Sequence, residues 1–228
     1  MKKYYIIIAL LICVIWTSCT KEKMAAGLSS LNVINANADI SSLTVNFTIT
    51  PIPFYQQQAI LSYGSGIEYG NPGGSLPLTL ISTADTLHHL FQASLNLPPG
   101  SIHSLYIAGT LQHIDTVFMQ DNIPPHTDST SGARFINLST DSGPVSINLQ
   151  GAATTEFSGL AYKKITAFKS YSAVNNITTN GGYTYEVRDA SNGVLTTFNW
   201  NPVVFKNYTL VISGNSNAGV QVFAVNNF

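Results

Sequence analysis

Two segments, LNVINANADISSLTVNF (residues 31–47) and ARFINLSTDSGPVSINL (residues 133–149), align without a gap. Four residues of the first segment, Ile34, Asn35, Asp39 and Asn46, fall on identical residues of the second. In residues 43–49 apolar and polar residues alternate, as they also do in residues 145–149. This period of two, rich in β-branched and aromatic residues, is typical of half-buried β-strands. The two segments therefore predict a β-protein that contains two copies of one fold.

Two further matches extend the duplication along the chain. The segment LSYGSGI (residues 61–67) resembles LAYKKI (residues 160–165), and LYIAG (residues 105–109) resembles LVISG (residues 210–214). The three matches keep their order, at offsets of 102, 99 and 105 residues. Such a period is too long for a solenoid, whose repeats have about 20–50 residues. We therefore predict two domains in tandem.

Each copy is predicted to be an antiparallel β-sandwich of the immunoglobulin-like type, so the fold class is all-β. The pattern predicts strands, and Gly, Pro and Asn turn signals separate them. Beyond the aligned segments, strands are expected at 76–81, 87–96, 102–108, 115–119, 183–188, 194–200, 208–213 and 220–225. The expected division is a signal peptide (1–18), a lipid-anchored tether (19–30), a first repeat (31–120), a linker (121–132) and a second repeat (133–228).

The N-terminus has the layout of a bacterial lipoprotein signal. Lys2 and Lys3 precede a short apolar run that ends at Trp16, and small residues lead to Cys19. The run is shorter than the roughly 20 residues that a membrane-spanning helix needs, which disfavours a transmembrane anchor. We expect lipid on Cys19 and an outer-membrane location, on the cell surface or the periplasmic face. Trp16 lies three residues before Cys19, where a lipoprotein signal usually has an aliphatic residue.

Composition excludes several classes of partner. Charged residues make up 9% of the chain and the formal net charge is −1, so no basic patch for nucleic acid is expected. No Lys or Arg lies between Lys23 and Arg134, whereas the second half carries most of the basic residues. This asymmetry either helps the two halves to dock or is drift on a solvated surface.

The repeated strand pattern, the "LxY" segment and the closing aliphatic pair with Gly resemble an exported bacterial family, domain of unknown function 4397. The resemblance covers residues 31–109 and 133–214 and is clearer in the second copy, because residues 51–58 are an insertion in the first. It implies tandem β-domains on a lipoprotein of Bacteroidetes. The family has no established activity, so the resemblance transfers no catalytic residue.

Three residues are candidates for a ligand site. Asp39 and Asp141 occupy matching positions, where a carboxylate can bind a hard cation or, more commonly, the amides of its own turn. Trp200 is the sole tryptophan after the predicted signal. An exposed tryptophan can stack on a sugar or anchor a protein partner, although packing in the core explains it more simply.

Catalytic and cofactor signatures are weak. His113 and Asp115 would share one strand face, which suits a metal pair, but their spacing fits no known metal signature. There is no Gly-x-Ser-x-Gly elbow and no supported carboxylate pair. We expect a non-enzymatic protein that needs no cofactor and no metal.

Three short Asp-Ser/Thr motifs resemble the sequon for O-glycosylation in Bacteroidetes, with Thr86, Thr116 and Ser129 as acceptors. The sequence as a whole favours a lipid-anchored envelope or cell-surface protein that binds, adheres or assembles through loops of its sandwiches. The alternatives are a carbohydrate-binding subunit of a surface uptake system and, less favoured, an envelope hydrolase. A glycan or a protein is the expected partner, besides the membrane itself.

Overall fold

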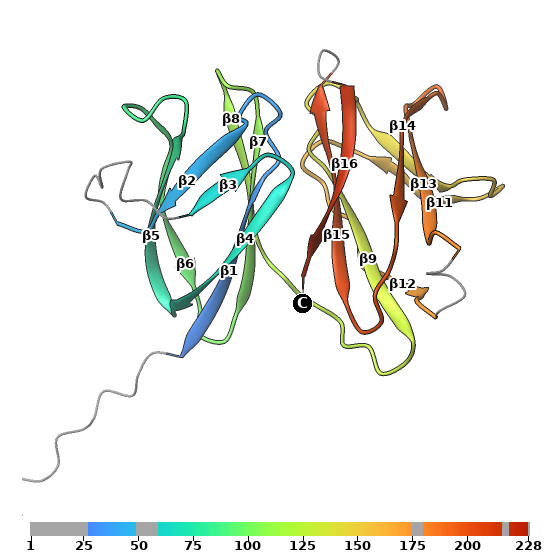
Figure 1. The fold of residues 1–228 in the computed structure, drawn as a ribbon, viewed down its shortest axis with the longest axis horizontal. Coiled ribbons are helices and arrows are strands. Elements are labelled where there is room, and N and C mark those ends of the chain that lie inside the picture. The colour runs from blue at the N-terminus through green and yellow to red at the C-terminus, as the bar shows by residue number, and fades with distance from the viewer. Residues whose placement is uncertain (1–26, 49–58, 175–179, 216–218, 228) are drawn as a thin grey trace, which may run out of the picture.

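The structure, a computed structural model, describes residues 27–48, 59–174, 180–215 and 219–227. This part of the chain is all-β, with sixteen strands in four four-stranded sheets and no helix (Figure 1). The all-β prediction is therefore confirmed, and the sheets are those expected of β-sandwiches. Among these residues no helix has the length and apolarity that a membrane crossing requires. The predicted signal peptide, Cys19 and the insertion at 51–58 lie outside the described residues.

The first half contributes two sheets, with strand orders β4-β1-β7-β8 and β3-β2-β5-β6. Their strands are β1 (Leu28–Asn35), β2 (Ser42–Asn46), β3 (Ile60–Ser62), β4 (Ser65–Pro72), β5 (Gly74–Ser82), β6 (His89–Leu97), β7 (Ile102–Gly109) and β8 (Ile114–Gln120).

The second half contributes sheets with the orders β12-β9-β15-β16 and β11-β10-β13-β14. Their strands are β9 (Thr130–Asn137), β10 (Val145–Leu149), β11 (Thr155–Leu160), β12 (Lys169–Ser172), β13 (Tyr183–Arg188), β14 (Val194–Trp200), β15 (Asn207–Asn215) and β16 (Gly219–Asn226). Every strand of the first half thus has a counterpart eight strands later, with the same neighbours.

The prediction of purely antiparallel sheets is wrong. β1 pairs in parallel with β7, with Val33 opposite Leu105, and β9 pairs in parallel with β15, with Phe135 opposite Leu210. The other strand pairs are antiparallel. The mixture arises because the first strand of each half runs beside the seventh, and the intervening strands return the chain to its starting edge.

Each half has its own core between its two sheets. In the first half it is aliphatic, and Leu31, Leu43, Leu78 and Leu105 are among its fully buried members. In the second half it contains an aromatic cluster, in which the rings of Tyr171, Tyr183, Tyr185 and Tyr208 all contact the ring of Trp200.

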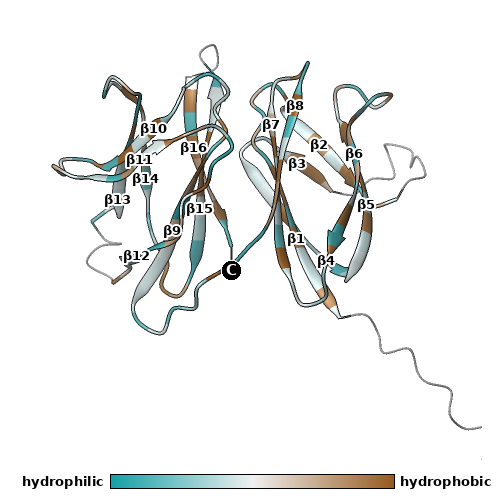
Figure 2. Cartoon of the chain, turned by 180° about the vertical axis from the view of Figure 1, so that it is seen from behind, coloured by the Kyte–Doolittle hydropathy of each residue, from teal (hydrophilic) through white to brown (hydrophobic). Residues whose placement is uncertain are grey.

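A third core joins the halves. The outward faces of β1 and β7 pack on those of β9 and β15, so these four strands are buried on both sides (Figure 1). Hydrophobic colouring is accordingly visible on the strands that line this contact (Figure 2). Its buried members are Ile34, Ala36, Tyr106, Ala108, Ile136, Leu138, Val211 and Val225.

Two strands extend into segments predicted as tether and linker. β1 starts at Leu28, inside the predicted tether, and β9 starts at Thr130, inside the predicted linker. The rest of the linker is held against the second half, because His126 Nε2 lies 3.0 Å from Asn207 Oδ1 and Asn207 Nδ2 donates to the Pro124 carbonyl at 2.9 Å. Residues 121–132 are therefore not a free spacer.

Candidate functional site

Both halves present their turns at two opposite edges (Figure 1). We call the edge at which β1 and β9 end the loop edge, and the edge at which they start the base edge. The connections β1–β2, β5–β6 and β7–β8 meet at the loop edge in the first half, and β9–β10 and β13–β14 meet there in the second. Loops on a rigid β-scaffold are where binding residues most often lie.

A hollow of about 560 Å³ opens at the loop edge of the first half. His88 and His89 line it from the start of β6, and His113 lines it from the β7–β8 connection, together with Asp85 and Leu111. His88 Nδ1 lies 2.8 Å from Asp85 Oδ2, and the hydrogen bond from His88 lowers the pKa of this exposed carboxyl.

His113 and Asp115, which the sequence places on one strand face without a known metal signature, lie near one another. His113 Nδ1 lies 4.0 Å from Asp115 Oδ1, but the Asp115 carboxylate is already bound by Lys163 Nζ and by the Tyr162 hydroxyl, at 2.9 Å for the latter. These bonds and the charge of Lys163 lower the pKa of Asp115, although its desolvation acts in the opposite direction. Nowhere in the described chain do three His, Cys, Asp or Glu side chains gather to hold a metal.

A second hollow, of about 400 Å³, lies at the equivalent place in the second half. Asp141 and Asp189 line it together with Leu195 and Val220. Asp189 Oδ1 accepts the amide of Gly193 at 2.8 Å, and that of Ser191 at the same distance, so this carboxylate holds its own turn. The hollow thus offers an acidic and apolar lining, in contrast to the histidines of the first.

Asp39 and Asp141 follow β1 and β9 at matching positions, each on the loop edge of its own half. Asp39 Oδ2 accepts the Leu111 amide at 3.1 Å, and the Asp39 amide donates to Asn37 Oδ1 at 3.0 Å. Asp39 therefore ties the β1–β2 connection to the β7–β8 connection. Of the two acids, only Asp141 lines one of these hollows.

Trp200 does not belong to a surface site. It is 2% exposed and packs in the aromatic core of the second half. The ligand-site hypothesis for Trp200 is wrong because β14 turns the face that carries Phe198 and Trp200 toward the opposite sheet.

Asn35 and Asn137, which the sequence comparison paired, shape the loop edge. Both are fully buried. Asn35 Nδ2 donates to the Ile40 carbonyl at 2.9 Å, and Asn137 Nδ2 donates to the Leu160 carbonyl at 3.0 Å. Each side-chain oxygen accepts the amide two residues on, which is the bond of an Asx-turn. Their identity in both repeats was the signal for this role.

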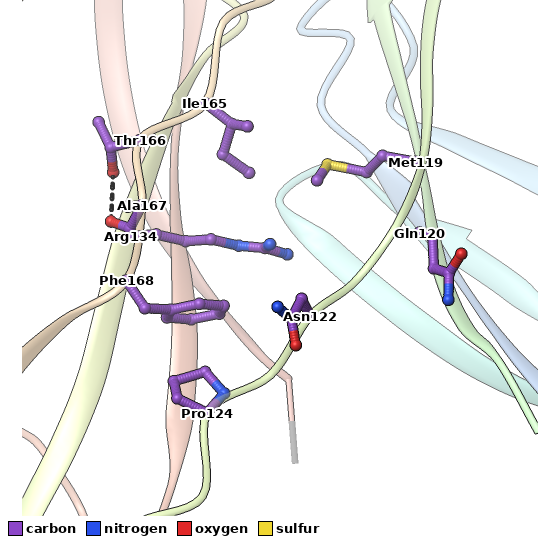
Figure 3. A pocket seen from close by; sticks show the side chains of 9 residues that line it. All are labelled: Met119, Gln120, Asn122, Pro124, Arg134, Ile165, Thr166, Ala167 and Phe168. Atoms are coloured by element: carbon purple, nitrogen blue, oxygen red, sulfur yellow. Dashed lines mark hydrogen bonds between the residues drawn. The ribbon is translucent and has the colours of Figure 1, made fainter.

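A further cavity, of about 400 Å³, lies between the halves (Figure 3). The Arg134 side chain points into it above Phe168, with its guanidinium carbon 4.5 Å from the ring centroid. Met119, Asn122 and Pro124 form the wall on the side of the first half and the linker. No sequence motif indicated this cavity, because its residues come from distant segments.

Buried polar groups surround Arg134. Its Nη2 donates to Asp121 Oδ1 across the contact between the halves, and its Nε donates to Thr209 Oγ1 at 2.8 Å. Asp121 Oδ2 accepts the Ser104 hydroxyl at 2.7 Å. Burial raises the pKa of the neighbouring Tyr106, which stays neutral.

Two tyrosines that the sequence comparison paired also bridge the halves. The Tyr63 hydroxyl lies 2.8 Å from Ser213 Oγ, and the Tyr162 hydroxyl donates to Asp115. In both ion pairs, Asp115 with Lys163 and Asp121 with Arg134, the acid lies on β8 or directly after it, and the base belongs to the second half. The uneven distribution of charge along the sequence thus includes the residues whose ion pairs join the two halves.

The three predicted glycan acceptors differ in accessibility. Thr86 and Ser129 are exposed, Thr86 on the β5–β6 connection and Ser129 just before β9. Thr116 is half-buried within β8, at an edge of its sheet.

No family model matches this chain, and no curated protein matches its sequence. Among solved structures, the C-terminal domain of AlgF from P. aeruginosa is 13% identical, with a TM-score of 0.29, over 42% of this chain and 99% of that one. An adhesin-like protein from Bacteroides ovatus is 8% identical, with a TM-score of 0.22, over 89% of this chain and 94% of that one. Both TM-scores are too low for either likeness to carry an argument.

Proposed function

We propose that this protein is a lipid-anchored binding protein of a bacterial outer membrane, and that the loop edge is its binding surface. The observation that carries the proposal is the position of the two hollows. Both lie at the loop edge, whereas the described chain begins at the opposite, base edge, where β1 starts (Figure 1). A lipid on Cys19 would hold the base edge toward the membrane and leave the loops free to bind.

Within this proposal the two halves are tandem immunoglobulin-like domains that arose by duplication. Their matching strand orders and their matching asparagines support this interpretation. The hollows have different linings: three histidines and one carboxylate in the first, and two carboxylates without a histidine in the second. The two domains therefore present different chemistry to a partner, as expected when one copy diverges from the other.

A protein partner fits the loop edge better than a glycan. Carbohydrate sites commonly offer an aromatic face for stacking, and the aromatic residue that the sequence suggested, Trp200, is buried. The exposed large apolar residues at the loop edge of the first half are aliphatic, with Leu87 86% exposed and Leu111 51% exposed. The function that we propose is adhesion to a protein partner or assembly with one. This is a binding role and not a catalytic one.

Protease accessibility on intact cells tests the anchor and the orientation. We expect the native chain to be acylated and digested from outside, and Cys19→Ala to lose the lipid. Acylated protein that resists digestion on intact cells would place the loops in the periplasm and exclude surface adhesion.

Protein and glycan arrays test the binding surface. We expect protein ligands to be retained, and His88→Ala combined with His113→Ala to weaken retention. Lys206→Ala at the base edge is the control and should bind as the native chain does. Loss of binding only in the control would show that the surface has been assigned to the wrong edge.

A further inference from the structure

Two equivalent turns lie at the base edge, one before β7 and one before β15 (Figure 1). In the first turn the Ser101 amide donates to the Pro98 carbonyl at 3.1 Å. The amide of Gly100 donates to the carbonyl of Leu28, the first residue of β1, at 2.8 Å. Gly100 has a φ of 77°, the left-handed region that suits glycine.

The second turn repeats this geometry with a different residue. The Lys206 amide donates to the Val203 carbonyl at 3.2 Å, and the Phe205 amide donates to the carbonyl of Thr130, the first residue of β9, at 2.9 Å. Phe205 therefore occupies the position of Gly100, and its φ is 64°. A bulky side chain is strained in this region, so phenylalanine at a glycine position calls for a reason.

One other repeat position shows the same replacement and also shows what offsets it. Lys163, with a φ of 61°, stands where the first half has Gly64, with a φ of 75°. The Lys163 ammonium forms the ion pair with Asp115 that joins the halves, so an attractive contact offsets the strain. The ring of Phe205, in contrast, is 55% exposed, and Val203 beside it is 52% exposed.

The base edge is also where the proposed lipid anchor leads. Seven residues, 20–26, lie between Cys19 and Gly27, where the described chain starts. Fully extended, the chain from Cys19 to Gly27 spans at most about 28 Å. Leu28, where β1 begins, is 72% exposed on this edge. A tether of this length allows the base edge to reach the lipid headgroups.

We propose that the turn Val203–Lys206 is a membrane-contact element, in which Phe205 and Val203 enter the headgroup region of the bilayer that carries the Cys19 lipid. Aromatic and aliphatic side chains gain free energy at this boundary. The Lys206 ammonium is placed to meet lipid phosphates. This inference rests on the proposed anchor at Cys19. It assigns the contact that determines the orientation of the anchored protein on the membrane.

The test uses the acylated full-length protein, purified from membranes and reconstituted into phosphatidylcholine vesicles that contain bromine-labelled acyl chains. Phe205→Trp places a fluorophore in the turn, and bromine quenches tryptophan only within the bilayer. We expect this variant to lose most of the added emission in brominated vesicles and none in unlabelled ones. The matched control is Leu87→Trp, an exposed position at the loop edge, which should keep its emission in both.

Phe205→Gly supplies a second measurement that does not depend on fluorescence. Glycine suits the φ of this position, so the variant folds, and we expect it to be digested faster than the native protein at the base edge when both are anchored to vesicles. Acylated protein with unquenched Phe205→Trp would overturn the membrane-contact element and leave the proposed function standing. A mass that shows no lipid on Cys19 would overturn both.

Discussion

Arg134 and Asp121 form an ion pair across the contact between the two halves, and both side chains are almost completely buried, at 4% and 1% exposed. Charges removed from water in this way lose much of their solvation free energy, which the pairing must return. Thr209 and Ser104 supply the additional hydrogen bonds that such a pair needs. The pair therefore favours one arrangement of the halves over others, since any slip would leave a buried charge without its partner.

Asp121→Asn is expected to lower the free energy of unfolding by about 3–5 kcal/mol, because it leaves the Arg134 charge buried and uncompensated. Urea denaturation measures this change. The control is Asp85→Asn, which alters an exposed carboxylate and should change the free energy of unfolding little. A cost for Asp121→Asn as small as that of the control would contradict the buried pair.

Replacing both partners is expected to cost less than replacing one. Arg134→Met together with Asp121→Leu removes both charges, so the double variant should recover most of the stability that either single variant loses. The same denaturation series tests this. Additive losses in the double variant would mean that the two residues act independently.

His103 is expected to make stability depend on pH. Its ring is 4% exposed and stacks on Phe118 with 5.1 Å between the ring centroids. Desolvation lowers the pKa of His103, and the charge of Asp121 opposes this only in part. Because the folded pKa is lower than the unfolded value of about 6.5, the stabilisation is complete above that pH and is lost as the pH falls toward the folded pKa.

Thermal denaturation between about pH 8 and about pH 5 measures this dependence. We expect the native chain to lose stability over that range, His103→Gln to show a flatter profile, and the exposed-site control His88→Gln to follow the native chain. A His103→Gln profile as steep as that of the native chain would assign the dependence to another group.

Trp200→Ala is expected to destabilise the protein by about 3–5 kcal/mol, since it opens a cavity among the aromatic rings of the second core. Trp200→Phe keeps part of the packing and should cost less. Chemical denaturation distinguishes the variants. If Trp200→Ala kept its stability but lost binding to a glycan or protein, Trp200 would be a ligand residue after all.

The two base-edge turns predict opposite responses to substitution. Gly100→Ala places a Cβ at a φ of 77° and should lower the free energy of unfolding by about 1 kcal/mol. Phe205→Gly removes that same penalty, so its stability should equal or exceed that of the native chain. Melting temperatures of the two variants provide the comparison, and a clear loss in Phe205→Gly would show that its ring supports the fold.

Glycosylation, if it follows the sequons, should favour the exposed acceptors Thr86 and Ser129 over the half-buried Thr116. The measurement is the intact mass of envelope-purified protein after removal of the lipid. Thr86→Ala and Ser129→Ala should each remove one glycan mass. A native mass equal to that of the bare polypeptide would disprove the modification.

The sequence predicted strands well wherever alternation was regular. The expected ranges 183–188 and 194–200 coincide with β13 and β14. β4 was not predicted, because it is an edge strand in which Gly66 and Gly70 interrupt the apolar pattern. The double burial of β1 and β7 also could not be read from the chain, since Ile34 and Tyr106 contact the other half.

The site was less predictable than the fold. Asp39 and Asp141 were singled out correctly as equivalent positions, but a single sequence does not show that Asp39 binds the Leu111 amide. The pairing of Asp121 with Arg134 was not predicted, because nothing in the aligned segments links these two residues. Such contacts depend on how sheets from distant segments meet, which local patterns do not encode.

The two hollows lie at the same edge of halves that a shared core holds together. A partner long enough to reach both hollows would therefore bind one molecule of this protein at two places. Once the first hollow is occupied, the second meets its segment at a high effective concentration, so two weak contacts combine into strong avidity. Because the linings differ, this bivalency also confers polarity, and a linear partner would be bound in one direction along the surface.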